Sequence, residues 1–222
     1  HNLANLNTTG FKADLDALQS EPVYGPGHPG RVYVQNLGAG ADFTGGQIIH
    51  TGRELDIAVQ GDGFIAIQDR DGSEGYTRAG DLRVNPNGIL ENGAGYPIMG
   101  NGGPIALPPF EKLEIGSDGT VSIQPVGQDA NTLAVVDRIK LVNPPTNELK
   151  KNDNGIFHGA NGPYEPDATI GVVNGSIEAS NVNAIDAMVK MIELSRQYEM
   201  QVKMMKTAQD NDAAAVKLMR VS

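Results

Sequence analysis

The sequence has 222 residues, of which 39% are hydrophobic and 20% charged, so it is long enough for one substantial domain with an appendage or for two small domains. Its formal net charge of -10 argues against nucleic acid and anionic membranes as partners, because both need a basic face. It contains no cysteine, which excludes disulfides and Cys-based metal chemistry, and no run of about 18 apolar residues that would span a membrane.

Residues 1–20 are predicted to form the end of a helix and the segment that follows it. Leu3, Ala4 and Leu6 fit the last helical turn, and Gly10 is a typical helix terminator after an Asn/Thr-rich stretch. Because these residues fit only the end of a helix, we expect the body of this helix to lie upstream of His1. The sequence shows no charged-then-apolar leader.

Residues 21–175 are predicted to form an antiparallel β-domain. Short apolar or alternating runs are separated by turn signals, and no amphipathic stretch of helical length falls between them, which argues against parallel βαβ units. Asp71-Gly72, Asn87-Gly88, Asp118-Gly119 and Asn154-Gly155 each supply the positive-φ residue of a tight turn. The expected strands are RVYVQ at 31–35, LDIAVQ at 55–60, GFIAIQ at 63–68, KLEIG at 112–116, TVSIQ at 120–124 and VVDRIKLV at 135–142.

Residues 176–222 are predicted to be a long terminal helix. All glycines and prolines lie at or before Gly175, whereas six of the seven methionines lie at or after Met188. Asn183 is a suitable N-cap, with Asp186 as a weak capping-box partner. Residues 177–222 hold six basic and six acidic side chains, so this segment is neutral and can pack beside a copy of itself.

The length of this helix and its apolar positions predict burial against other chains. About 38 residues make a helix of roughly 57 Å, whereas a β-domain of this size is only about 40 Å across, so the helix is expected to project beyond it. The apolar stripe is broad and changes register. Its positions are Ile185, Met188 and Ile192, then Met191, Leu194, Tyr198, Val202 and Met205, and later Val216 and Met219.

Catalytic and metal sites are not expected. The four histidines (His1, His28, His50 and His158) are far apart in the sequence, and no nucleotide-binding or serine-nucleophile motif occurs. The stretch from Asp69 to Glu74 superficially resembles a calcium loop, but its sixth residue is Glu74, where the sharp turn needs glycine. A solvated hairpin turn is the better interpretation, and we predict no enzyme, cofactor or metal.

Several short motifs in a fixed order resemble those of the bacterial flagellar axial proteins of the rod and hook. The compact middle domain and the stretch YEMQVK at 198–203 are more similar to the proximal than to the distal rod proteins. The motifs are NLAN at 2–5 with TTGFK at 8–12, LDIAV at 55–59 with GDGF at 61–64, YTRAG at 76–80 with NGIL at 87–90 and GYP at 95–97, GSIEASNV at 175–182, and the helix from Met191-Ile192 through Tyr198-Glu199.

The resemblance implies a structural subunit of the basal-body rod. In that family the terminal helices pack into a coiled-coil-like tube and the β-domains form an outer layer, so the assembly transmits torque across the periplasm and lines the export channel. It implies copies of the chain, proximal and distal rod proteins and the flagellar export apparatus as partners, with export that needs no cleavable signal peptide. The implied assembly interface is Asn2, Leu3, Ala4, Asn5, Thr9, Gly10, Phe11, Ile185, Met188, Met191, Ile192, Tyr198, Val202 and Met205.

Two alternatives stay open at this point. The first is a distal rod or hook-type axial protein. The second is a β-domain on a trimeric coiled-coil stalk, as in adhesins or phage tails. A trimer favours a sustained a/d pattern of Ile, Leu or Val, whereas this stripe is wide, drifts and is rich in Met.

Overall fold

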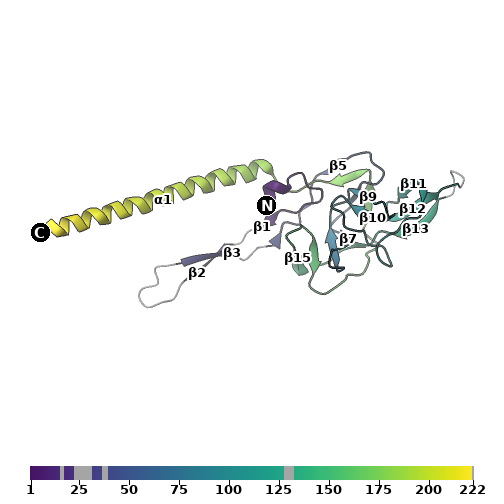
Figure 1. The fold of residues 1–222 in the computed structure, drawn as a ribbon, viewed down its shortest axis with the longest axis horizontal. Coiled ribbons are helices and arrows are strands. Elements are labelled where there is room, and N and C mark those ends of the chain that lie inside the picture. The colour runs from purple at the N-terminus through teal and green to yellow at the C-terminus, as the bar shows by residue number, and fades with distance from the viewer. Residues whose placement is uncertain (16–17, 23–31, 37–39, 128–132, 222) are drawn as a thin grey trace. The chain divides into compact units, whose positions relative to one another are not determined.

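The computed structural model describes residues 1–15, 18–22, 32–36, 40–127 and 133–221; the side chains of residues 18–22, 32–36, 212 and 214–221 are not described. The chain forms two compact units, residues 1–182 and residues 183–222. The first unit is built from short strands (Figure 1), and every pairing between the described strands is antiparallel. The predicted fold class, mainly antiparallel β-structure with a long terminal α-helix, is confirmed.

The described strands of the first unit form seven small sheets, and two of these have more than two strands. The larger has the order β14 (Leu141–Val142), β7 (Phe64–Gln68), β8 (Glu74–Thr77), β16 (Phe157–Gly159) and β15 (Leu149–Lys151). The other is β11 (Phe110–Ile115), β12 (Thr120–Pro125) and β13 (Ala134–Arg138). The two-stranded pairs are β1 (Asp14–Leu15) with β4 (Gly40–Ala41), β2 (Leu18–Pro22) with β3 (Val32–Asn36), β5 (Ile48–His50) with β18 (Ser176–Glu178), β6 (Ile57–Val59) with β17 (Val172–Asn174), and β9 (Leu82–Val84) with β10 (Leu90–Asn92).

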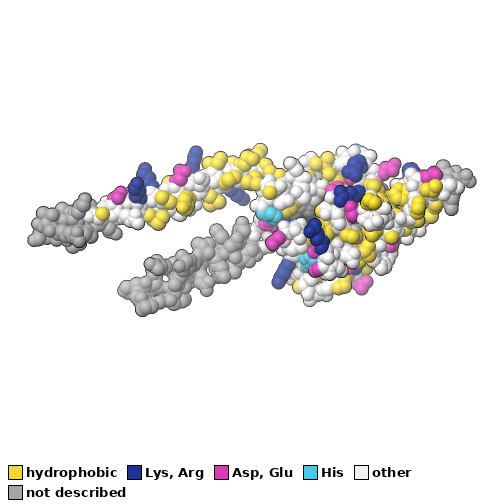
Figure 2. All heavy atoms as spheres, in the orientation of Figure 1, with side chains coloured by type: hydrophobic (Ala, Val, Ile, Leu, Met, Phe, Trp, Pro, Cys, Tyr) yellow, Lys and Arg dark blue, Asp and Glu magenta, His cyan; other side chains and the backbone are white. Residues whose placement is uncertain are grey.

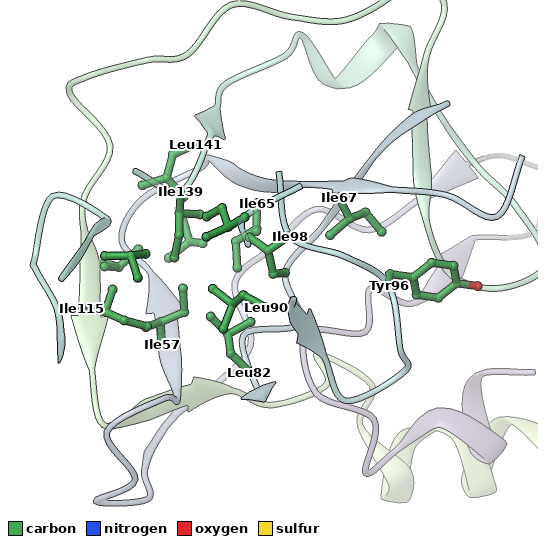
Figure 3. Packing of buried hydrophobic residues seen from close by; sticks show 14 of the residues in the cluster. Ile57, Ile65, Ile67, Leu82, Leu90, Tyr96, Ile98, Ile115, Ile139 and Leu141 are labelled. Atoms are coloured by element: carbon green, nitrogen blue, oxygen red, sulfur yellow. The ribbon is translucent and has the colours of Figure 1, made fainter. Parts of the chain in front are cut away.

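Strand β7 is buried on both faces and separates two hydrophobic clusters. Ile65 and Ile67 point into the larger cluster, where they pack with Ile57, Leu90 and Ile98 (Figure 3). Phe64 and Ala66 alternate with them and face the smaller cluster, which includes Tyr76 and Phe157. Side chains alternate between the two faces of a strand, so burial of both faces explains why the sequence here is a continuous apolar run.

The predicted turns are confirmed. Gly72, Gly88, Gly119 and Gly155 have φ values of 85°, 79°, 83° and 81°, which L-residues other than glycine rarely adopt. At Gly88 a side chain is excluded for a second reason, because an added Cβ would lie 2.6 Å from the carbonyl oxygen of Leu107.

Three segments of the described chain are helical. At the N-terminus, η1 (Asn2–Asn5) is one turn of 3₁₀-helix, where the sequence predicted the last turn of a helix, and Gly10 follows with φ 65°. The short η2 (Thr146–Glu148) precedes β15. Helix α1 (Ala184–Val221) has 38 residues and starts directly after the predicted N-cap Asn183. Residues 176–178, which the sequence assigned to the helical segment, form strand β18 instead. The boundary predicted after Gly175 remains a prediction; the structure groups β18 and the residues up to Val182 with the first unit.

Candidate assembly surfaces

Helix α1 begins at a side-chain cap. The Oδ1 atom of Asn183 accepts hydrogen bonds from the backbone N–H groups of Ile185 at 3.0 Å and Asp186 at 3.3 Å. These donors belong to the first turn, which has no partners inside the helix, so the asparagine satisfies them as the sequence predicted.

The large apolar side chains of α1 between Ile185 and Met205 are exposed, as Figure 2 shows along the helix. Each of the seven helix residues expected at the interface has between 40% and 73% of its surface exposed. Val189, Leu194, Met200 and Met204 are also exposed. Patches of this kind on a soluble protein mark an interaction site.

These side chains form two sets on different sides of the helix. At about 100° per residue, the set of Ile185, Met188, Val189 and Ile192 is centred about 130° from the set of Met191, Leu194, Tyr198, Val202 and Met205. A polar side runs along Asp186, Lys190, Glu193 and Gln197 in the first half of the helix, and the exposed Met204 lies on this side farther along. One partner helix can cover one apolar stripe, so covering the two sets requires at least two partner helices.

The N-terminal signature residues take part mainly in contacts within the first unit. Asn2 donates to the carbonyl oxygen of Asp14 at 2.9 Å and accepts from its N–H at 2.8 Å. Gly10 and Phe11 are buried, whereas Asn5 and Thr9 are partly exposed. Leu3 and Ala4 are exposed, so they alone among the signature residues present an open apolar surface.

Gly10 lies where the backbone passes very close to a neighbouring segment. A Cβ atom on Gly10 would lie 2.2 Å from the backbone carbonyl carbon of Arg78. Gly80 approaches in the same way, because its Cβ would lie 1.8 Å from the carbonyl oxygen of Ile57. Glycine is therefore required in the TTGFK and YTRAG motifs for close packing.

The motifs TTGFK, YTRAG and GSIEASNV each contribute one residue to a buried ion cluster, which we define as Lys12, Arg78 and Glu178. Between 1% and 4% of each residue is exposed. The Nζ of Lys12 lies 2.8 Å from Oε1 of Glu178, and Nη1 of Arg78 lies 3.3 Å from Oε2. Burial lowers the pKa of the Arg78 guanidinium, while Glu178 and Asp62 counteract this effect.

Each member of this cluster also binds the backbone. Lys12 donates to the carbonyl oxygen of Thr44 at 2.7 Å, and Glu178 accepts from the N–H of Gly46 at 2.8 Å. Arg78 donates to the carbonyl oxygens of Val59 at 3.1 Å and Gly61 at 2.5 Å. This cluster was not predictable from the sequence, because Lys12 and Glu178 are 166 positions apart and a lone charged residue is normally solvated.

The stretch that resembled a calcium loop is a hairpin turn between β7 and β8. Ser73 donates to Oδ1 of Asp71 through its N–H at 2.9 Å and its hydroxyl at 2.6 Å, and Gly72 is exposed. Within the described part of the chain, no group of three or more His, Cys, Asp and Glu residues has a metal-binding arrangement. None of the described helices is both long enough and apolar enough to cross a bilayer.

Two family models match the chain. The C-terminal model of the flagellar basal body rod FlgEFG proteins matches residues 173–218, which include β18, the cap residue Asn183 and most of α1. The D1 domain model of the flagellar hook proteins FlgE/F/G matches residues 58–123, which include β7, β8 and the β11–β12 hairpin.

Curated relatives match over nearly the whole length of the chain. The FlgF basal-body rod protein of Escherichia coli K12 is 43% identical over all of this chain and 90% of its own length, and that of Salmonella typhimurium LT2 is 40% identical over the same shares. The FlgG basal-body rod protein of Bacillus subtilis 168 is 31% identical over 95% of this chain and 88% of its own length. The chain therefore belongs to the family of flagellar basal-body rod and hook proteins, resembles FlgF within it, and is a structural subunit of the flagellar rod.

Proposed function

We propose that the chain polymerises through α1 and that the polymer is a segment of the torque-transmitting shaft. The observation that carries this proposal is the exposure of the seven predicted interface residues on α1. Complete burial of a Val, Ile or Met side chain contributes about 1.5–3 kcal/mol. Burying all seven would contribute on the order of 10 kcal/mol per subunit before the entropy of association is subtracted.

The two apolar sets of α1 favour an open-ended assembly. If each set packs on a different neighbour, each subunit makes two unlike contacts, and such heterologous contacts generate filaments when the rotation does not close. The flexible methionine side chains adapt to neighbours of slightly different shape, as a rod of several related proteins demands. Hence the partners that we propose are copies of this chain and proximal and distal rod proteins.

The N-terminal signature contributes to assembly in two ways under this proposal. Leu3 and Ala4 offer an exposed apolar surface to a neighbour. Asn2, Gly10 and Phe11 act indirectly, because their contacts hold the segment that presents this surface. Asn5 and Thr9 are proposed as polar contacts at its margin.

The proposed site of action is the rod within the periplasm, where the assembled helices would line the export channel. The chain would reach this site through the flagellar export apparatus without a cleavable signal peptide. We propose a mechanical role without catalysis, supported by the rod proteins among its relatives.

Aspartate at Ile192, Val202 or Met205 tests this proposal. An unpaired carboxylate buried between subunits costs several kcal/mol, so we expect each variant to abolish swimming. The exposed side chains lie in solvent in the isolated chain, so its free energy of unfolding is expected to change by less than about 0.5 kcal/mol.

Gln197→Asp is the matched control, because it places the same residue on the polar side of the same helix. Cells with this variant are expected to swim. If cells with each of the three single variants remain motile, the proposed interface on α1 is refuted. Sedimentation of the full-length chain gives a second check, because a discrete trimer would support the stalk alternative, whereas a monomer or an open-ended polymer would support the rod.

A further inference from the structure

The segments that lead into and out of the first unit are bound to each other. We call residues 8–14 the incoming segment and residues 176–182 the outgoing segment. Gly10 donates its N–H to the carbonyl oxygen of Glu178 at 2.7 Å, and Asn181 donates to that of Phe11 at 3.2 Å. The side chain of Asn181 accepts from the N–H of Ala13 at 2.7 Å and donates to the carbonyl oxygen of Asp42 at 2.8 Å.

Lys151 also binds the incoming segment, through contacts with Phe11, Lys12 and Asp14. Its Nζ lies 3.7 Å from the centre of the Phe11 ring and donates to the carbonyl oxygen of Lys12 at 2.7 Å. It also forms an ion pair with Asp14 at 2.6 Å. The incoming segment is therefore held between β15, which contains Lys151, and the outgoing segment.

Glu178 connects these contacts to the rest of the unit. Its two carboxylate oxygens face Lys12 from the incoming segment and Arg78 from the segment after β8. Apolar side chains of similar volume often give equal or greater stability than a buried ion pair. The charged groups add directional contacts, because each hydrogen bond fixes its donor relative to its acceptor, and Glu178 Oε1 binds both Lys12 and the N–H of Gly46.

We infer that Lys12, Arg78 and Glu178 form a positioning joint, which holds the incoming and outgoing segments as one body with the β-strands. Helix α1 starts six positions after Glu178, so force on the helix reaches the first unit through the outgoing segment. The joint would transmit that force to Lys12 and Arg78 at the same time. Its mechanical role rests on the proposed function, whereas the joint itself is testable in the isolated chain.

Hydrogen exchange of the isolated chain carrying Glu178→Gln is the direct test. The variant removes the carboxylate that pairs with both buried cations, so the amides of Gly10, Ala179 and Asn181 should exchange together, about tenfold faster or more. Core amides such as that of Leu82 are expected to change less. Lys12→Met, which keeps the Arg78–Glu178 pair, should accelerate the same amides, and it replaces Glu178→Gln if that variant does not fold.

Glu74→Gln is the matched control, because Glu74 forms a comparable ion pair with Lys140, at 2.9 Å and with 12% of each side chain exposed. This pair holds β8 and does not contact either terminal segment. The control is expected to leave the three amides unchanged relative to the core. Equal acceleration by both substitutions, or acceleration in only one of the two segments, would overturn the joint.

Swimming of cells that carry Glu178→Gln as their only copy separates the joint from the proposed function. Loss of swimming, with swimming retained in Glu74→Gln cells, is the expected result. If Glu178→Gln cells swim normally while aspartate in α1 abolishes swimming, the mechanical role of the joint fails and the assembly proposal stands. If the α1 variants also swim, the proposed function itself fails.

Discussion

Asp81 carries a carboxyl group whose ionisation opposes folding. Burial raises its pKa above the ordinary value of 3.8, and the nearby carboxylate of Asp56 raises it further. Hydrogen bonds from the backbone of Asp81 and Gly93, and to a smaller extent the charge of Arg53, partly offset this rise. Asp56 already accepts a hydrogen bond from Thr51 at 2.6 Å and pairs with Arg53 at 3.4 Å. The folded state thus binds a proton at Asp81 more tightly than the unfolded state does, and stability from this residue is lost as the pH rises through its folded pKa.

We predict that Asp81→Asn stabilises the chain near neutral pH by up to about 1 kcal/mol. The gain should disappear below the ordinary pKa of 3.8, where Asp81 is protonated in both states. Thermal unfolding at a series of pH values measures this difference.

Asp118→Asn is the control of opposite sign. Hydrogen bonds from the side chain and backbone of Thr120 lower the pKa of Asp118, so its contribution to stability is present at neutral pH and lost in acid. This substitution should destabilise near neutral pH and have no effect in acid. If the difference in unfolding free energy between Asp81→Asn and the unsubstituted chain does not change with pH, the charge of Asp81 does not oppose folding.

Individual residues differ in how well the sequence predicted them. The positive φ of Gly88 follows from local chemistry, since an Asn-Gly pair favours a tight turn wherever it occurs. The burial of Lys12 depends on Glu178 and Thr44, which the chain brings together only when it folds. No local pattern encodes such a contact.

At the scale of the elements, the cap at Asn183 governs how α1 begins. It satisfies two backbone donors of the first turn, and Asn183 also accepts from Ala187 through its own carbonyl oxygen at 3.0 Å. We predict that Asn183→Ala destabilises the start of the helix by about 1 kcal/mol.

Hydrogen exchange of the amides of Ile185 and Asp186 measures this effect, and both are expected to exchange faster. Ser195→Ala changes an exposed residue inside the same helix and should leave these amides unchanged, because alanine favours helix. Unchanged exchange in Asn183→Ala would contradict the role of the cap.

The elements themselves were largely predictable, whereas their arrangement was not. The run GFIAIQ predicted β7, and turn residues predicted where neighbouring strands separate. Pairs such as β5 with β18 join residues more than 120 positions apart, and strand propensity does not specify the partner. The helical end expected at Leu3 is one 3₁₀ turn that Asn2 ties to Asp14, a tertiary contact that the local pattern does not contain.

At the scale of the whole molecule, the two units differ in how their apolar residues are covered. The first unit buries Ile57, Ile65 and Leu82 completely in its own core. In α1, by contrast, the seven interface residues remain exposed, although their composition resembles that of a core. The apolar sets of the helix follow from their helical spacing and were predictable from sequence, whereas the neighbours that we propose to cover them are not encoded in a single chain.

The central claim is that neighbouring subunits cover both apolar sets of α1 in the rod, and single engineered cysteines test it most directly. The chain has no cysteine, so a maleimide would react only at Met188→Cys, from the first set, or Met205→Cys, from the second. Both should react readily in the isolated chain and in basal bodies dissociated by denaturant. In intact basal bodies that still support swimming, we predict that both are protected. If a cysteine at either position reacts as fast in intact basal bodies as in the isolated chain, neighbouring subunits do not cover that apolar set of α1.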